Sequence, residues 1–152
     1  MAAQPWLASV AGAVALEAEA GHIDCAVAAE QVDTLMVEPR FMARAAINLL
    51  RNAIRHAHGR IAITLLQPDA NHYWLVVDDD GPGVPAADRA RIFEPFTRLD
   101  ASRNRATGGF GLGLAIVRRI AEWHHGTVEV VDSPLGGARF IVSWTAAIEA
   151  AV

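Results

Sequence analysis

Apolar residues recur at helical spacing between Arg40 and Ala57, in the run FMARAAINLLRNAIRHA. Apolar residues three and four positions apart share one face, so the pattern predicts an amphipathic helix. Pro39 stands where a helix can begin, because the N–H that proline lacks is not needed at the first helical position. Gly59 stands just past the expected end. We therefore predict a helix from Arg40 to about Ala57 with one buried face.

Beyond this helix, the apolar residues change to the period of two that is typical of strands. Two such segments, Arg60–Leu66 and His72–Asp78, are separated by a short stretch that contains Pro68, Asp69 and Asn71. These residue types favour turns, because proline fixes φ and the Asp and Asn side chains bond to nearby backbone groups. We predict a β-hairpin here.

The next part of the chain is richer in turn-forming residues. Asp79–Ala87 is a loop of glycine and proline, and Asp88–Phe93 has the composition of a short helix. Residues 97–109, TRLDASRNRATGG, offer almost nothing apolar to bury. A mobile surface loop is expected there.

Helical spacing returns between Leu112 and His125, and Gly126 fits a left-handed cap after this helix. Two further strands are predicted at about residues 127–131 and 138–144, with a turn at 133–137. Paired strands that alternate with long helices indicate a single α+β domain over residues 1–152. We expect a two-layer α/β sandwich, in which helices cover one face of a mixed, mostly antiparallel sheet.

The composition of the chain limits the possible classes of function more than it limits the possible folds. Of the 152 residues, 53% are hydrophobic and 20% are charged, which suits one packed core. The net charge of -4 gives no general attraction for nucleic acid, so phosphate groups would need a local site. The apolar stretch Ala2–Leu16 contains Pro5, lacks a basic start and is too short to span a membrane. The single cysteine, Cys25, is expected to be a small buried residue.

Asn48, Asn52 and His56 lie four residues apart along the predicted long helix, so they share one face. This face borders the apolar one, and a buried amide without a partner costs about 1–3 kcal/mol. A ligand that bonds to the amides would offset that cost. Two asparagines on a solvated helix edge would have the same spacing, so the pattern alone leaves both interpretations open.

An apolar strand runs directly into Asp79, Asp80, Gly81, Pro82 and Gly83. A carboxylate at a strand end followed by two glycines lets the backbone approach a ligand closely. The carboxylate can then accept a hydrogen bond, for example from an exocyclic amine. A tight turn formed for local reasons would use the same residue types, so this pattern too has two interpretations.

Glycines crowd the start of the second long helix, in the run from Gly108 to Leu114. Backbone N–H groups at a helix N-terminus, together with the helix dipole, form a cradle for phosphate. The run is not a P-loop, because this chain has no lysine, and no strand leads directly into it as a dinucleotide fingerprint requires. The polar loop upstream carries Arg98, Arg103 and Arg105, which could pair with phosphates or simply be solvated.

In this order, the segments resemble the ATP-binding superfamily of DNA gyrase, heat-shock chaperones, mismatch-repair ATPases and sensor histidine kinases. NLLRNA at Asn48–Ala53 resembles its N box, DDGPG at Asp79–Gly83 its first glycine box, and GFGLG at Gly109–Gly113 its second. IFEPF at Ile92–Phe96 resembles the F box of histidine kinases, and GGARF at Gly136–Phe140 favours the same branch. The resemblance covers about residues 37–144. It implies the ATP-binding catalytic domain of a sensor histidine kinase.

The resemblance also implies roles for single residues. Asn52 would coordinate a Mg²⁺ ion that bridges the ATP phosphates, and Asp79 would accept a hydrogen bond from the adenine amine. The expected catalytic set is Asn48, near the γ-phosphate, with Arg103 or Arg105 of the ATP lid. The expected nucleotide-binding set is Asn48, Asn52, Arg55, His56, Asp79, Gly81, Gly83, Val84, Phe93, Gly109, Phe110, Gly111, Leu112, Gly113 and Leu114.

No histidine of the chain has the neighbours of the family's phosphoacceptor histidine, H-E-x-R-T-P or a close variant. We expect a monomeric cytoplasmic domain of an inner-membrane sensor, without the helical dimerisation and phosphoacceptor hairpin. That hairpin would be its partner, and a response regulator would act downstream. Three alternatives stay open: a nucleotide-binding regulatory module without turnover, an ATPase of the gyrase or chaperone branch, and a relative of the anti-sigma serine kinases. The ATPase branch usually has glutamate at the position of Asn48, and the F box disfavours the serine kinase.

Overall fold

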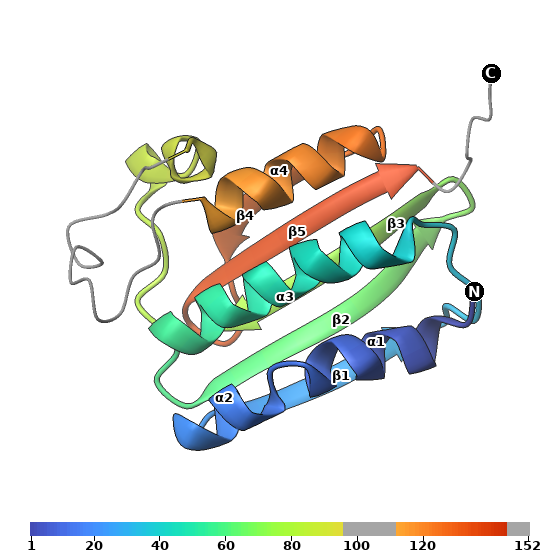
Figure 1. Cartoon of the computed structure of the whole chain (residues 1–152). Coiled ribbons are helices and arrows are strands. Elements are labelled where there is room, and N and C mark those ends of the chain that lie inside the picture. The colour runs from blue at the N-terminus through green and yellow to red at the C-terminus, as the bar shows by residue number, and fades with distance from the viewer. Residues whose placement is uncertain (96–111, 146–152) are drawn as a thin grey trace.

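The computed structural model describes residues 1–95 and 112–145, which form a five-stranded sheet with helices on one side (Figure 1). The strands are β1 (Asp24–Glu30), β2 (Arg60–Asp69), β3 (His72–Asp79), β4 (Thr127–Asp132) and β5 (Ala138–Thr145). The helices are α1 (Ala3–Gly12), α2 (Ala15–Ala20), α3 (Pro39–His56) and α4 (Gly113–Trp123). Two short 3-10 turns, η1 (Ala86–Asp88) and η2 (Arg91–Phe93), replace the expected short helix after β3.

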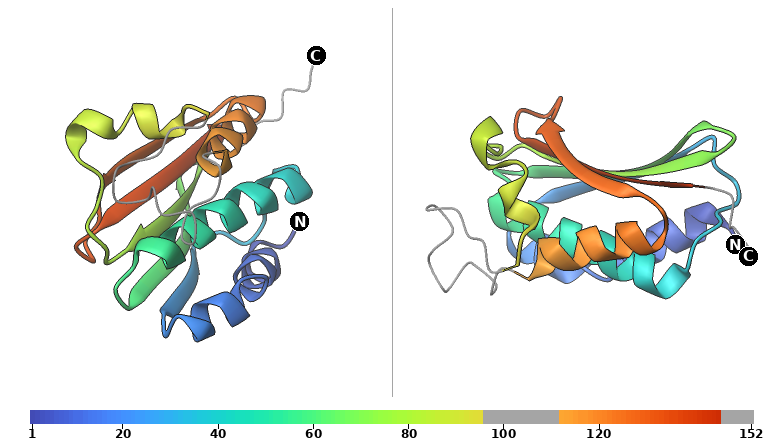
Figure 2. Two further views of the ribbon diagram at one scale, coloured as in Figure 1. Left: turned by 60° about the vertical axis from the view of Figure 1, so that its left-hand side comes forward. Right: turned by 90° about the horizontal axis from the view of Figure 1, so that it is seen from above.

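The strand order in the sheet is β1-β2-β3-β5-β4. β1 pairs with β2 in parallel, and the other neighbours are antiparallel. The right-hand view of Figure 2 shows the α-helices on the same face of this sheet. The predicted two-layer α+β sandwich with a mixed, mostly antiparallel sheet is therefore confirmed, and so is the hairpin of β2 and β3.

The core lies between the sheet and α3. Alternate strand residues such as Ile63, Leu75 and Phe140 point toward the helices and are almost fully buried. α3 presents the opposite wall of the core with Met42, Ala45, Ala46, Leu49, Leu50 and Ala53. Burial of each large apolar side chain contributes about 1.5–3 kcal/mol, so the apolar stripe of α3 is what holds the amide stripe beside it in place.

The start of α3 is tied to the end of α4. The Glu38 side chain caps α3 by accepting a hydrogen bond from Arg40 N at 3.1 Å. Glu38 N donates to His124 Nε2 at 3.1 Å, while His124 Nδ1 lies 2.9 Å from the carbonyl oxygen of Ile120. These contacts suit a neutral ring that donates from Nδ1 and accepts at Nε2. The two helices that border the candidate site are thus fixed to each other at their far ends.

The cap after α4 differs from the expectation. His125, with φ of 58°, takes the left-handed conformation, and the prediction that Gly126 would do so is wrong. Gly126 serves a close approach instead, because a Cβ at this position would meet the backbone carbonyl of Ser143. Glycine is needed there for space rather than for a positive φ.

Residues 1–36, to which the apolar pattern assigned no element, form α1, α2 and the parallel edge strand β1. Leu7 and Val10 of α1 are buried against the sheet, so this segment extends the helical layer over β1 and β2. Cys25 is only half-buried, which corrects the expectation that it is a core residue. Within the two described stretches, no helix combines the length and apolar character that crossing a membrane requires.

Candidate functional site

The Asp79 carboxylate at the end of β3 is nearly enclosed, since only 3% of the residue is exposed. Its Oδ1 atom accepts hydrogen bonds from Gly81 N at 2.9 Å and from Ala138 N at 3.2 Å. No donor from residues 1–95 or 112–145 reaches its Oδ2 atom. A buried carboxylate oxygen without a donor is costly. This oxygen is therefore available for a hydrogen bond with a ligand.

Glycines pack tightly around this carboxylate. A Cβ on Gly81 would meet the backbone carbonyl of His56, at the end of α3. A Cβ on Gly137 would meet Asp79 Oδ1 and Gly81 N. Gly83 has φ of 79°, a conformation that side chains other than glycine rarely adopt. The loop after β3 thus passes directly between the end of α3 and the start of β5, where no larger residue would fit.

Asp80 fastens the same loop to the segment after α3. Its Oδ1 atom accepts hydrogen bonds from His58 N at 2.7 Å and Gly59 N at 3.0 Å. Backbone hydrogen bonds, that of Gly59 first, lower the pKa of the Asp80 carboxyl. The ionised carboxylate therefore holds the two segments together at neutral pH.

The predicted amide stripe of α3 is present. Asn52 is 7% exposed and Asn48 is half-buried. Asn48 Nδ2 donates to the carbonyl oxygen of Gly113 at 3.4 Å, and Asn52 Oδ1 accepts from Arg55 Nη2 at 3.4 Å. His56 Nδ1 lies 2.9 Å from the backbone carbonyl oxygen of Asn52. The two amide contacts are long and hence weak, so a ligand could replace them at little cost.

These contacts bring the predicted segments together. The middle of α3 touches the start of α4 through Asn48 and Gly113, and the end of α3 touches the loop after β3 through His56 and Gly81. Asp79 follows Val77 on the strand face that points toward the helices. The end of α3 and the start of α4 lie at one end of the molecule (Figure 1). The described parts of the segments that resemble the N box and the two glycine boxes therefore adjoin one another.

The remaining predicted residues fall into three groups. Phe93 is buried and meets the Phe140 ring edge-on at 6.0 Å, so it contributes to the core. Val84 is half-buried and packs against the same core. Leu112 is 41% exposed at the start of α4, next to the half-buried Leu114. Five predicted residues lie outside the described residues: Arg103, Arg105, Gly109, Phe110 and Gly111.

Comparison with known proteins agrees with this arrangement. The family described as histidine kinase-, DNA gyrase B- and HSP90-like ATPase matches residues 37–148. The chain belongs to this family.

Two solved structures and one curated protein show which branch is similar. Sensor protein RstB of Escherichia coli (strain K12) is 52% identical over 108 residues, which are 71% of this chain and 25% of RstB. Full-length ShkA in complex with AMPPNP has a TM-score of 0.83 at 30% identity, over 97% of this chain and 31% of ShkA. A mycobacterial sensor histidine kinase, MprB, has a TM-score of 0.80 at 27% identity, over 93% of both chains. The chain is thus homologous to ATP-binding domains of sensor histidine kinases and spans about a quarter of RstB.

Sequence reasoning missed a second buried carboxylate, which precedes Asp79 on β3 and lies on the opposite face of the sheet. Asp78 is 4% exposed and pairs with Arg139, with 2.8 Å between Oδ1 and Nε. Ser133 Oγ also donates to Asp78 Oδ1, at 2.8 Å. The hydrogen bond with Asp78 raises the pKa of the Arg139 guanidinium. Two consecutive carboxylates at the buried end of a strand, Asp78 and Asp79, were the available signal, because an unpaired charge is not tolerated there.

The described residues suit a metal ion that is held together with phosphates. Over the described residues, no group of three or more His, Cys, Asp or Glu side chains could hold a metal ion. The amide oxygen of the buried Asn52 is a hard ligand of the kind that Mg²⁺ accepts. Mg²⁺ commonly takes one or two protein ligands and fills its other positions with water and substrate phosphates. The residues present fit that mode of binding.

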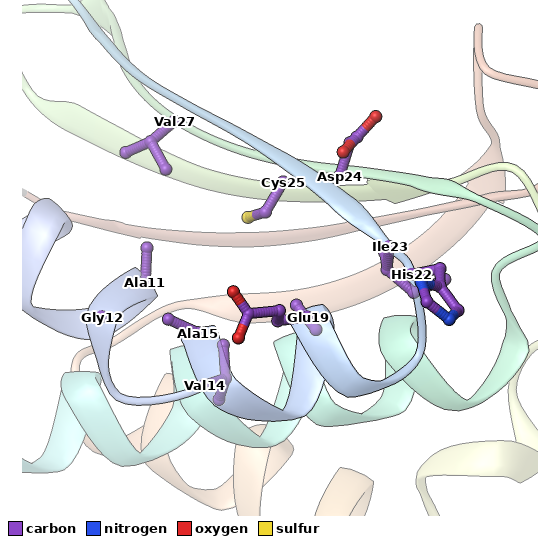
Figure 3. A pocket seen from close by; sticks show the side chains of 11 residues that line it. Ala11, Gly12, Val14, Ala15, Glu19, His22, Ile23, Asp24, Cys25 and Val27 are labelled. Atoms are coloured by element: carbon purple, nitrogen blue, oxygen red, sulfur yellow. The ribbon is translucent and has the colours of Figure 1, made fainter.

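A separate hollow of about 610 Å³ lies between the α1–α2 segment and β1 (Figure 3). It is lined by small apolar residues together with Glu19, His22, Asp24 and Cys25. Burial raises the pKa of the Cys25 thiol, which makes it a poor nucleophile at neutral pH. None of the predicted nucleotide-binding residues lines this hollow, so it does not belong to the site.

Proposed function

We propose that this chain binds Mg-ATP and transfers the γ-phosphoryl group to a histidine on a separate helical dimerisation and phosphoacceptor hairpin, in two-component signalling. The geometry of Asp79 is the observation that supports this most. One carboxylate oxygen is held by two backbone N–H groups, and the other has no donor within the described residues. An acceptor of this kind beside closely packed glycines suits the exocyclic amine of an adenine base. AMPPNP, bound in the similar ShkA structure, is an adenine nucleotide.

The phosphate end of the site would be formed by α3 and the start of α4. Asn48, Arg55 and His56 would contact the phosphates or the ribose, and the N-terminus of α4 would add its dipole. Asn52 would hold Mg²⁺, which supplies charge neutralisation when it is bound. Arg103 or Arg105 would contact the γ-phosphate. These roles remain predictions, and so do the response regulator and the inner-membrane location.

Asn48 favours transfer to a protein histidine over hydrolysis. Phosphoryl transfer passes through a loose transition state, so positioning and neutralisation of charge do most of the work. In the transfer, a new N–P bond forms on the acceptor imidazole while the bond from the γ-phosphorus to the leaving ADP oxygen breaks. An asparagine amide cannot take a proton from water, whereas a glutamate at this position could. We therefore expect slow ATP turnover when no hairpin is present.

The test is to mix the purified chain with γ-labelled Mg-ATP and a purified helical hairpin that carries the acceptor histidine. We expect label on the hairpin that is stable in alkali and lost in acid, as a phosphohistidine is. A hairpin with His→Gln at the acceptor and a chain with Asp79→Asn should both lose the signal.

The other outcomes separate the alternatives. ATP binding without any transfer would indicate a regulatory module. Rapid phosphate release without the hairpin would indicate an ATPase of the gyrase or chaperone branch. Label that survives acid would indicate a protein serine kinase. Absence of ATP binding would contradict the proposal outright.

A further inference from the structure

Asp78 and Asp79 are consecutive on β3, so their side chains lie on opposite faces of the sheet. Asp78 lies on the face opposite the helices, yet it is as well buried as a core residue. Its cross-strand partner Arg139 donates from Nε to Oδ1 at 2.8 Å and from Nη2 to Oδ2 at 3.1 Å. Ser133 Oγ adds a third hydrogen bond to Oδ1 at 2.8 Å. Asp78 is therefore fully engaged with protein groups, whereas Asp79 keeps one oxygen for a ligand.

Both carboxylates hold the turn between β4 and β5. Asp79 accepts from the backbone of Ala138, and its carbonyl oxygen accepts from Gly137 N at 3.1 Å. Asp78 holds the side chains of Ser133 and Arg139, which flank the same turn. Ser133 N also donates to the carbonyl oxygen of Gly137 at 2.8 Å, which closes the turn. The turn is therefore attached to β3 from both faces of the sheet.

The position of this turn determines where the Asp79 carboxylate points. A carboxylate is planar and rigid, so the donors on Oδ1 fix the direction of Oδ2. One of those donors, Ala138 N, belongs to β5, and Gly137 leaves no room for even a Cβ against Asp79 Oδ1. A displacement of the turn would therefore move Oδ2 and weaken a hydrogen bond whose strength depends on alignment.

We propose that Ser133, Asp78 and Arg139 are positioning residues, which hold the β4–β5 turn so that Asp79 Oδ2 points at the exocyclic amine of adenine. Through this orientation they set how strongly the site prefers ATP over ITP, whose base has an oxo group in place of the amine. The inference rests on the proposed ATP-binding function.

The experiment measures dissociation constants for Mg-ATP and Mg-ITP by titration calorimetry on the whole chain. Ser133→Ala and Arg139→Gln should each reduce the preference for ATP over ITP by about three- to tenfold, because one aligned hydrogen bond is weakened. Arg139→Lys keeps a charged donor and should retain most of the preference. Glu17→Gln removes the Arg51–Glu17 pair, which joins α2 to α3 with 3.1 Å between Nη2 and Oε1, and should leave the preference unchanged.

A merely structural role would lower the affinity for both nucleotides by the same factor, and that result would overturn the inference. An unchanged preference in both Ser133→Ala and Arg139→Gln would overturn it as well. If Arg139→Gln does not fold, Ser133→Ala decides the matter, because it removes a single hydroxyl group. A wild-type chain that binds ATP no better than ITP would instead refute the adenine role of Asp79, and with it the proposed function.

Discussion

The two ends of the site are built differently. At the Asp79 end, the carboxylate is 3% exposed, its backbone bonds are 2.9 and 3.2 Å long, and glycines fill the remaining space. At the α3 end, Asn48 and Asn52 make contacts of 3.4 Å, and Asn48 is only half-buried. The first region is held in place by the protein's own backbone and by close packing. The second presents polar groups whose present contacts are weak.

This difference indicates that the two ends of the site would contribute differently to the binding of a nucleotide. A preorganised acceptor loses little freedom when the ligand binds, so it contributes affinity and base specificity. Amides with long contacts can exchange them for phosphate oxygens or a metal ion without a large cost. We therefore expect the base to be recognised by the fixed end, and binding of the phosphates to depend on Mg²⁺ at the other.

The largest effect is expected for Asp79→Asn. Because two backbone N–H groups need the amide oxygen at Oδ1, the NH₂ group would take the ligand side and face the adenine amine donor to donor. We expect the affinity for ATP to fall about 30- to 100-fold, while ITP, which offers an acceptor oxygen, loses much less. Calorimetry with both nucleotides measures this. Asp69→Asn, which changes an exposed carboxylate at the end of β2, is the matched control, and equal ATP affinity in the two variants would refute the assignment.

Next in size is the effect of Gly137→Ala on folding. The added methyl group would meet Asp79 Oδ1 and Gly81 N in a closely packed region. It should therefore lower the free energy of unfolding by about 1–3 kcal/mol. Gly12→Ala is the control, since nothing lies within 4 Å of its Cβ position at the end of α1. That change should stabilise the chain by about 0.5–1 kcal/mol. Urea unfolding of both variants measures the difference. Similar values would show that the packing around Asp79 can accommodate a methyl group.

At the α3 end, Asn52→Ala should remove the benefit of Mg²⁺. We expect the ATP affinity to fall about tenfold in Mg²⁺ and hardly at all in EDTA, because the amide oxygen acts through the metal ion. Asn71→Ala, in the exposed β2–β3 turn, is the control and should behave as wild type in both conditions. If Asn52→Ala weakened binding equally with and without Mg²⁺, the amide would contact the nucleotide itself rather than the metal.

Local patterns predicted most of the fold because α3, α4 and the β2–β3 hairpin have strong periodicity. The long helix was expected from Arg40 to about Ala57 and is observed from Pro39 to His56. The first 36 residues were harder, because alanine-rich segments show little contrast between faces. β1 in particular pairs in parallel with β2, and no turn-forming sequence between the two strands indicates this non-local contact.

The candidate site was predictable to a similar degree. Asn48, Asn52 and Asp79 could be found from spacing and from the family resemblance, and the structure brings their segments together. The pairing of Asp78 with Arg139 could not be predicted from the sequence. The two residues are 61 positions apart and meet only when β3 and β5 pair in one register. The packing of Phe93 on Phe140 could not be predicted either, since an aromatic residue near a site looks the same in sequence whether it contacts a ligand or fills the core, and its expected contact with the nucleotide stays a prediction.

The smallest expected effect concerns Asp80, which joins the two ends through the segment after α3. Hydrogen bonding lowers its pKa in the folded chain, so its ionised form contributes stability above the ordinary aspartate pKa of about 3.9, and this is lost as the pH falls through the lowered value. Asp80→Asn should therefore lower Tm slightly near neutral pH, with a deficit that shrinks as the pH falls from neutral into the acid range through the lowered pKa, because the wild-type carboxyl is then protonated too. Thermal unfolding across this pH range measures the deficit in Tm.

Asp69→Asn is the control, because its carboxylate pKa is also lowered, mainly by its hydrogen bond with His72. It should show the same trend in Tm without any change in ATP affinity, because Asp69 has no contact with the site. A Tm deficit of Asp80→Asn that stayed constant between neutral and acid pH would show that the charge on Asp80 does not hold the junction between the two ends.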